Sequence, residues 1–334
     1  MTPHHLSASL ALAVALMACV SGDGDAPPPD APTAHAAPEP GQEPRSTEAV
    51  TPPRATSVEP PAPAPAEVRS PTTEELSRYA FLPTGAKIRA LKDTAAPPRG
   101  FRRIDLPSNG FGAYLRELPL RSAEAAVHAF DGSVLRQADD PRVFAVAELD
   151  VSPLDVQQCA DSVIRLHAEW RWSRGEKARI GYHFLSGDYA TYTRYAAGER
   201  PRVDGNRVTW ATTAAPSDDR KTFRRYLDLV FNYASTISLA QRAEKVDQAS
   251  LVPGDFFVLP GGPGHAILIL DVAHDDEGRR VALLGQGFMP AQDFHVLASN
   301  EPGLSPWFSL DGEAVDTPFW PAAFPWSSLR RFRE

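Results

Sequence analysis

Two polar side chains lie inside the most apolar stretch of this 334-residue chain. Residues 251–288 contain two β-type apolar runs separated by Gly-Gly-Pro-Gly, and a third run follows after a polar turn. His265 opens the second run and Gln286 closes the third. An unsatisfied polar side chain in such surroundings costs on the order of 1–3 kcal/mol. The pattern therefore predicts a buried antiparallel hairpin in which this histidine and glutamine have a specific purpose.

The register of that hairpin brings the two polar side chains together. A turn centred on Asp276 and Glu277 places Gln286 opposite Ile267, on the face of His265 and diagonal to it. Cβ atoms at that diagonal lie about 7–8 Å apart or somewhat less, within reach of a long side chain. We therefore expect Gln286 to orient the His265 imidazole.

The N-terminus has the pattern of an export signal. Residues 6–18 form an almost unbroken run of apolar and small residues, shorter than the roughly 20 that span a bilayer. The sequence Leu-Met-Ala-Cys that ends at Cys19 resembles the bacterial lipobox. That resemblance implies a signal peptide at residues 1–18, a lipid on Cys19, and an exported protein anchored to a membrane of the cell envelope. Because His4 and His5 stand where lysine or arginine is usual, a plain secretory signal is the alternative.

The segment after the signal has the composition of a tether. Residues 20–73 contain fourteen prolines and no aromatic residue, so they cannot bury enough apolar surface to offset the entropy of folding. We expect residues 19–73 to be a lipidated, disordered linker and residues 74–334 to be one domain. The linker carries −5 of the net charge of −8, which leaves the domain near −3 with no basic stripe. Nucleic acid is therefore not an expected partner.

The domain is expected to belong to the α+β class. Its clearest helix runs over residues 151–171, with Ser152 as cap and Pro153 at the first position. Cys159 then falls on the apolar face, nearly two turns inside the helix; a start near Asp155 would bring it close to the first turn. Other expected elements are strands at 111–116 and 143–147, helices at 122–130 and 221–243, and an irregular tail from Ser305.

Three residues have the types and the order that nucleophilic catalysis requires. If Cys19 is lipidated, Cys159 is the one remaining thiol, which excludes an intramolecular disulfide. A thiol needs a base to become a nucleophile, and the base needs a group that fixes its direction. We therefore assign Cys159 as candidate nucleophile, His265 as base and Gln286 as orienter.

Each of these residues also has a plain structural interpretation. Cys159 could be a small buried hydrophobe, and Gln286 could satisfy buried backbone groups. Asp161 and Arg165 could pair with each other at i, i+4 on the same helix.

Further candidates surround these three residues. Gly262 and Gly264 would let a substrate approach closely, and His295 is an alternative partner or a substrate contact. No histidine pair has zinc-ligand spacing, so neither a metal nor another cofactor is expected.

The arrangement resembles the papain-like superfamily, in particular cell-wall cysteine peptidases of the NlpC type. In those enzymes Gly-Asp and apolar residues precede a Gly-His that starts a hairpin, as Gly254-Asp255 and Gly264-His265 do here. The resemblance implies a helix that carries the cysteine, packed on an antiparallel sheet that carries the histidine. Cys159-x-Asp also resembles the start of the catalytic helix in the transglutaminase-like branch.

The chain is also similar, over most of residues 76–332, to an uncharacterised family of bacterial lipoproteins known only as a domain of unknown function. The shared motifs are QQCAD at 157–161, YASTISL at 233–239, GGPGHA at 261–266, MPAQDFHVL at 289–297, and TPxW at 317–320. This similarity implies no activity.

Together these features favour a tethered cell-envelope cysteine hydrolase that cleaves peptide or amide bonds of the cell wall. One alternative is a binding or scaffold lipoprotein of the same fold without catalysis. Another is an acyl-transfer enzyme, because hydrolysis and transfer share an acyl-enzyme.

Overall fold

The computed structural model of the protein describes residues 66–333. The predicted signal peptide, the lipidation of Cys19 and almost all of the predicted tether lie outside the described residues. Ordered contacts begin ahead of Glu74, because Arg69 and Ile88 exchange backbone hydrogen bonds of 3.0 and 2.8 Å. No helix of residues 66–333 combines the length and the apolar character needed to cross a bilayer.

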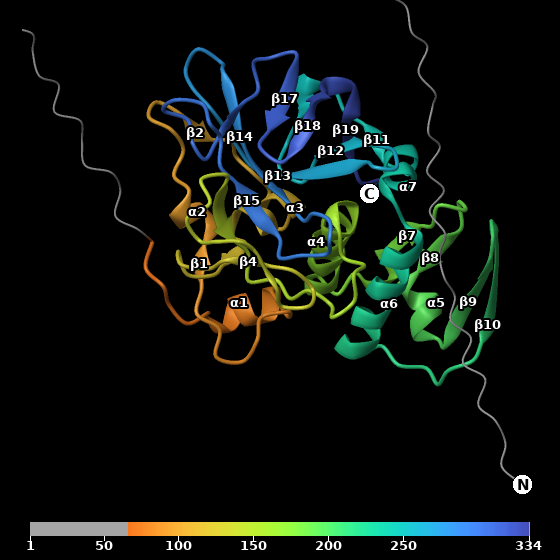
Figure 1. The fold of residues 1–334 in the computed structure, drawn as a ribbon. Coiled ribbons are helices and arrows are strands. Elements are labelled where there is room, and N and C mark those ends of the chain that lie inside the picture. Colours follow the sequence, from red (N-terminus) through yellow and green to blue (C-terminus); the bar gives the residue numbers. More distant parts are fainter. Residues whose placement is uncertain (1–65, 334) are drawn as a thin grey trace, which may run out of the picture. The chain divides into compact units, whose positions relative to one another are not determined.

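Nine strands form an antiparallel sheet at the centre of the domain (Figure 1). They are β2 Arg102–Arg103, β6 Val143–Val146, β11 Glu244–Lys245, β12 Phe256–Leu259, β13 His265–His274, β14 Arg280–Gln286, β15 His295–Leu297, β16 Phe308–Ser309 and β19 Leu329–Arg331. The order is β11-β19-β12-β13-β14-β15-β6, while β16 pairs with β14 and β2 with β13. The long β13–β14 hairpin therefore lies in the middle of the sheet, as its apolar sequence predicts.

The remaining strands form two-stranded ladders. They are β1 Arg89–Ala90 with β3 Pro119–Leu120, β4 Val127–His128 with β5 Val134–Arg136, β7 Gly181–His183 with β8 Tyr189–Thr191, β9 Glu199–Asp204 with β10 Arg207–Thr212, and β17 Ala314–Thr317 with β18 Trp320–Pro325. The helices are α1 Thr73–Arg78, α2 Leu91–Thr94, α3 Phe111–Arg116, α4 Cys159–Ser173, α5 Tyr192–Ala196, α6 Arg220–Tyr233 and α7 Thr236–Arg242. Three 3-10 turns complete them: η1 Lys177–Arg179, η2 Gln248–Ser250 and η3 Trp326–Ser328.

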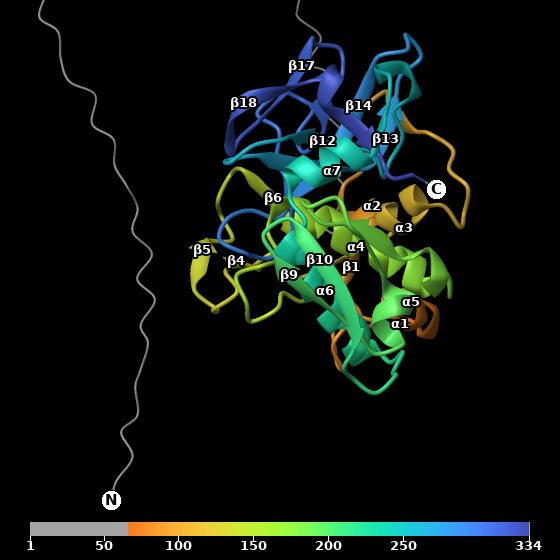
Figure 2. The same cartoon turned by 90° about the vertical axis from the view of Figure 1, so that its right-hand side faces the viewer.

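Both faces of the central sheet are covered (Figures 1 and 2). On one face α4 packs against β13 and β14 and contacts α6 on its other side. Leu268 and Leu270 of β13 belong to the hydrophobic cluster on this face. Ile267 and Ile269 belong to a second cluster, which includes Phe324 of β18. Because both faces are buried, β13 is apolar at nearly every position instead of at every second one. The mixture of helices and antiparallel sheet fits the α+β class.

Helix α4 begins later than the sequence pattern indicates. We expected a helix from residue 151, but the first helical residue is Cys159. Side-chain contacts to distant segments hold the preceding residues out of the helix. Asp155 Oδ1 accepts a hydrogen bond of 2.7 Å from the backbone N–H of Ala291, and Gln157 Oε1 accepts one of 3.0 Å from Arg224. Cys159 is consequently the first residue of α4, not a residue two turns inside it.

Several other boundaries differ from the prediction. Residues 111–116 form α3, not a strand, because Phe111, Tyr114 and Leu115 follow helical spacing and two of them are buried. Residues 122–130 form a turn and β4 instead of a helix. The helix expected over 221–243 is divided into α6 and α7, since Ser235 caps a new helix by accepting a hydrogen bond from Ser238 N–H. The tail after Ser305 is not irregular, because β16 and β19 join the central sheet. The strand expected at 143–147 is confirmed as β6.

Candidate active site

Three polar side chains form a hydrogen-bonded chain across adjacent strands β13, β14 and β15. His265 Nε2 lies 2.8 Å from Gln286 Oε1, and Gln286 Nε2 lies 3.3 Å from His295 Nε2. The other nitrogen of His295, Nδ1, lies 3.1 Å from the backbone carbonyl of Asp293. All three side chains are buried. The contact expected between Gln286 and His265 is therefore present, and His295 joins the same chain through Gln286.

The backbone carbonyl at the end of this chain fixes every proton in it. A carbonyl oxygen can only accept, so His295 carries its proton on Nδ1 and offers a lone pair at Nε2. The amide N–H of Gln286 donates to that lone pair, which turns Oε1 toward His265. Oε1 can only accept, so His265 is protonated at Nε2. The lone pair of the neutral imidazole is consequently at Nδ1, and His265 Nδ1 is buried without a hydrogen-bond partner among the described residues.

Aromatic rings surround the His265 imidazole. Trp320 of β18 stacks on it with ring centroids 4.9 Å apart, and the rings of Phe288 and Phe324 lie 5.0 and 6.0 Å away. Burial lowers the pKa of His265 from 6.5 to about 4, although the hydrogen bond that His265 donates to Gln286 opposes this shift. Burial likewise lowers the pKa of His295 to about 4. Both imidazoles are therefore neutral at physiological pH.

The Cys159 thiol lies at the N-terminus of α4, beside the start of β13. Its Sγ is 3.9 Å from the backbone carbonyl oxygen of Gly264, the residue that precedes His265. Burial and the nearby Asp161 raise the thiol pKa to about 11, and the backbone N–H groups of Ala266 and Ala160 oppose this shift only in part. The thiol is therefore protonated at neutral pH.

The thiol and the imidazole approach the strand from different sides. Cys159 belongs to the helix that covers the first cluster, whereas the His265 ring packs against Phe324 of the second cluster. Within residues 66–333 no hydrogen bond joins Sγ to the imidazole, and the thiol contacts the main chain next to it instead. Two predicted members of the site, His265 and Gln286, are thus in direct contact, while Cys159 is a neighbour of the pair.

Two glycines allow neighbouring segments to approach the hairpin this closely, α7 and β12 at Gly264 and α4 at Gly287. A Cβ atom on Gly264 would lie 2.4 Å from Thr236 Oγ1 and 2.7 Å from the Leu259 carbonyl oxygen. A Cβ atom on Gly287, directly after Gln286, would lie 2.2 Å from Ser162 Oγ. Since these distances leave no room for a side chain, both positions require glycine. Gly262, in contrast, faces open space.

A cavity of about 340 Å³ opens at the Cys159 thiol. Its walls come from the segment before α4, the first turn of α4, the link between α6 and α7, and the loop from Gly261 to Gly264. Gly262 and Gly264, which the sequence indicated as substrate contacts, are both part of this lining. No group of three or more His, Cys, Asp or Glu side chains in residues 66–333 could hold a metal ion.

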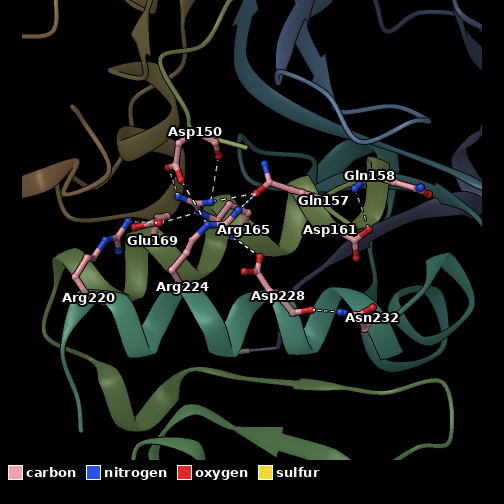
Figure 3. Close-up of polar contacts among 10 residues, drawn as sticks. All are labelled: Asp150, Gln157, Gln158, Asp161, Arg165, Glu169, Arg220, Arg224, Asp228 and Asn232. Carbon is pink, nitrogen blue, oxygen red and sulfur yellow. Dashed lines mark hydrogen bonds and ion pairs between the residues drawn. The ribbon is translucent and has the colours of Figure 1, made fainter. Parts of the chain in front are cut away.

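Asp161 does not form the ion pair with Arg165 that their i, i+4 spacing would allow. Its Oδ2 accepts a hydrogen bond of 3.1 Å from the backbone N–H of Gln158, which caps the helix. Arg165 instead contacts Glu169, one turn further along α4, at 2.7 Å, and Asp150, in the segment before α4, at 2.6 Å (Figure 3). The i, i+4 spacing alone could not choose between Asp161 and Glu169, since both lie four residues from Arg165. The residues that surround Arg165 in the folded protein decide that it pairs with Glu169.

Sequence reasoning missed the aromatic enclosure of His265 and the fixed direction of the proton chain. Trp320 and Phe324 lie more than fifty residues from His265 in the sequence, and no local pattern links them to it. The one available signal was the TPxW motif of the C-terminal tail. Similarly, His295 was a candidate, but only strand β15 shows that it contacts Gln286 and not the substrate cavity.

Comparison with known proteins gives one match. A family model described as domain of unknown function 4846 matches residues 91–331, more than two thirds of the 334-residue chain. No curated protein and no solved structure matches the chain. The matched range contains α4, the β13–β14 hairpin, β15 and the C-terminal strands, and hence every residue of the site described above. The chain therefore belongs to the family of domain of unknown function 4846.

Proposed function

We propose that this protein is a cysteine hydrolase of papain-like type that cleaves an amide bond, with Cys159 as nucleophile, His265 as base and Gln286 as orienter. The observation that carries this proposal is the asymmetry of the His265 ring. Its Nε2 is held by Gln286 at 2.8 Å, while Nδ1 is buried and has no partner among the described residues. An imidazole that is fixed at one nitrogen and has an unused lone pair on the other is prepared to accept a proton.

The position of Cys159 supports its role as the nucleophile. It is the first residue of a fifteen-residue helix, where unpaired backbone N–H groups and the helix dipole favour negative charge. The same N–H groups can stabilise the oxyanion that forms when sulfur attacks a carbonyl. The thiol also lines a cavity that is large enough for a small amide.

The resting pair is a thiol and a neutral imidazole, since the pKa of Cys159 is about 11 and that of His265 about 4. Proton transfer therefore accompanies the attack. The thiol exchanges the Gly264 carbonyl for Nδ1 of His265, gives up its proton, and sulfur bonds to the amide carbon. The C–N bond then breaks, and the leaving nitrogen takes the proton from Nδ1. Water next gives a proton to Nδ1 and its oxygen bonds to the thioester carbon. The C–S bond then breaks, and the sulfur takes the proton from Nδ1, which restores the thiol and the neutral imidazole.

The substrate class follows from the predicted location. A lipid on Cys19 and a long linker would place the domain in the cell envelope, where peptide and amide bonds of the cell wall are the accessible substrates. If an amine replaces water in the second half-reaction, the same site transfers the acyl group, as a transglutaminase does.

Cleavage of cell-wall peptides by the purified protein, followed by mass spectrometry, tests the proposal. We expect Cys159→Ala to abolish cleavage and Gln286→Ala to reduce it strongly, because the imidazole is no longer held. The matched control is Ser162→Ala, one turn along the same helix face and outside the proposed chemistry. Cleavage that persists in Cys159→Ala would refute the assignment.

One observation favours a second candidate, a binding lipoprotein without catalysis. The thiol is buried, its pKa is raised, and it contacts a backbone carbonyl, as a core cysteine would. Alkylation of the native protein with iodoacetamide distinguishes the two. A nucleophile with this pKa should react faster by about tenfold per pH unit from pH 7 to 9, because the thiolate is the reacting form. Reaction only after unfolding would favour the binding protein.

A further inference from the structure

Asp161 lines the cavity beside Cys159 and has one carboxyl oxygen that no described residue uses. Its Oδ2 caps α4, but Oδ1 is buried and has no hydrogen-bond partner among the described residues. The residue is only 7 % exposed, and Figure 3 shows a single contact to its carboxylate, from Gln158. A buried polar atom without a partner costs on the order of 1–3 kcal/mol. Helix capping accounts for one oxygen and leaves the second unexplained.

The rest of the lining adds negative charge and no positive charge. Besides Asp161, Asp155 lines the cavity, and no Lys, Arg or His does so. The only ionisable cavity residue apart from these two is the Cys159 thiol, which is protonated at neutral pH. Such a lining attracts a cationic group and repels an anionic one.

We propose that this cavity binds a primary ammonium group through Asp161, and that in catalysis the group belongs to the molecule whose carbonyl Cys159 attacks. An ammonium group supplies the donor that Oδ1 lacks and the charge that the carboxylate needs. Recognition of the cation depends on the cavity alone; its place in the substrate rests on the proposed function. The substrate class is thus an amine-bearing peptide or amide.

The ionisation of Asp161 is consistent with this role. Burial raises the pKa of Asp161 to about 8, so the carboxyl is largely protonated when nothing positive lies beside it. A cation within hydrogen-bond distance favours the ionised form, and a charge-assisted hydrogen bond replaces an orphaned oxygen.

Ligand-observed NMR titration of the full-length Cys159→Ala protein tests the proposal without requiring turnover. The probes are L-alaninamide, which carries an ammonium group, and N-acetyl-L-alaninamide, which has the same amide and no charge. We expect L-alaninamide to bind at least about tenfold more tightly. Asp161→Asn should reduce that preference to about twofold or less, while Asp204→Asn, which changes an exposed aspartate outside the cavity lining, should retain it. Equal binding of the two probes, or a preference that survives Asp161→Asn, would overturn the ammonium site.

The outcomes separate this inference from the proposed function. Asn at position 161 still offers an oxygen to the Gln158 N–H, so the helix cap is kept; if the variant nevertheless does not fold, the two-probe comparison in the Asp161 protein decides on its own. Cell-wall cleavage that survives Cys159→Ala removes the hydrolase and leaves the probe preference standing. Equal probe binding removes the ammonium site even if Cys159 proves to be the nucleophile.

Discussion

The middle and the N-terminal end of α4 use buried polar groups in opposite ways. In the middle of the helix, the fully buried Arg165 guanidinium lies between Glu169 and Asp150, and Arg220 adds a second cation to Glu169 (Figure 3). Burial lowers the pKa of Arg165, but the two carboxylates outweigh burial and raise it overall. Each charge there has an opposite partner. The region fixes α4 against α6 and the segment before α4.

At the N-terminal end, one turn away, the polar groups are buried without such partners. The thiol of Cys159 is neutral, the pKa of Asp161 is raised, and His265 Nδ1 and Asp161 Oδ1 have no hydrogen-bond partner in the part of the chain described. Burying these groups without partners destabilises the protein when no ligand is bound. Unsatisfied groups gathered around one cavity are what a site for a ligand requires, whereas paired charges indicate a structural role.

The largest expected effect comes from breaking the paired region. Arg165→Met leaves Glu169, whose side chain is 1 % exposed, with one cation fewer in a buried position. We expect the free energy of unfolding to fall by about 3–5 kcal/mol, because removing one partner of a buried ion pair leaves an uncompensated charge. Urea unfolding measures this change in the free energy of unfolding. Lys92→Met, which breaks the more exposed pair with Glu117, is the control and should cost no more than about 1 kcal/mol.

The next effect has the opposite sign and comes from the unpaired region. The pKa of Asp161 is about 8 in the folded protein, above its ordinary value of 3.8, so the folded state holds its proton more tightly than the unfolded chain does. The contribution of Asp161 to the free energy of unfolding is most favourable at low pH and is lost as pH rises from about 4 to 8. Asp161→Asn should therefore be more stable than the wild type at pH 8.5, by several kcal/mol, and similar to it at pH 4. Urea unfolding of both proteins measures this. A difference in the free energy of unfolding between variant and wild type that is the same at pH 8.5 and at pH 4 would contradict the prediction.

His265 gives an acid-side effect of somewhat smaller size. Its pKa is lowered from 6.5 to about 4 by burial, so the unfolded chain takes up a proton at a higher pH than the folded protein. Stability is constant above about pH 6.5 and falls as pH drops toward 4, by roughly 2–3 kcal/mol. We expect His265→Gln to remove this part of the acid loss, measured by urea unfolding at pH 7 and pH 4.5. Burial lowers the pKa of His295 in the same direction, so His295 adds its own part to the loss of stability in acid.

The smallest effect tests the proton chain. His295→Phe leaves the Gln286 amide without the acceptor at 3.3 Å, which should cost about 1 kcal/mol of stability. It also frees the amide to turn over, so that His265 can carry its proton on Nδ1. Nitrogen-15 NMR of the imidazole measures that tautomer directly. His295→Asn retains an acceptor and should keep His265 protonated at Nε2; an unchanged tautomer in His295→Phe would show that His295 does not set it.

The hairpin shows how far sequence reasoning extends in this protein. An apolar run, a turn and a second run fix a strand register, because side chains alternate with a period of two and a slip would invert every one. The observed register pairs Leu268 with Gly285, so Gln286 falls beside Ile267 as predicted. Nearer the turn the register shifts by one residue at a bulge between Ile269 and Asp271, which no local pattern indicated. The contact between His265 and Gln286 was predictable because both ends of it lie within a single hairpin.

The start of α4 shows where such reasoning ends. Ser152 and Pro153 have the local signature of a helix start, yet Asp155 and Gln157 bind groups from distant segments, and the helix begins at Cys159. Local capping energies are about 1 kcal/mol, and a few buried tertiary hydrogen bonds exceed them. That shift of eight residues converts Cys159 from a mid-helix core position to the first residue of the helix.

The sequence by itself determined the elements whose information is local: the central hairpin, the pairing of its two polar side chains, the α+β class and the family. Only the tertiary structure decided which groups are left without partners. Asp161 and Glu169 have the same spacing from Arg165. The surrounding segments pair Glu169 with Arg165 and leave Asp161 Oδ1 without a hydrogen-bond partner among the described residues. The proton on His265 is set by a carbonyl two strands away. Satisfaction of a buried polar group depends on everything within about 3 Å of it, and most of that lies far away in the sequence.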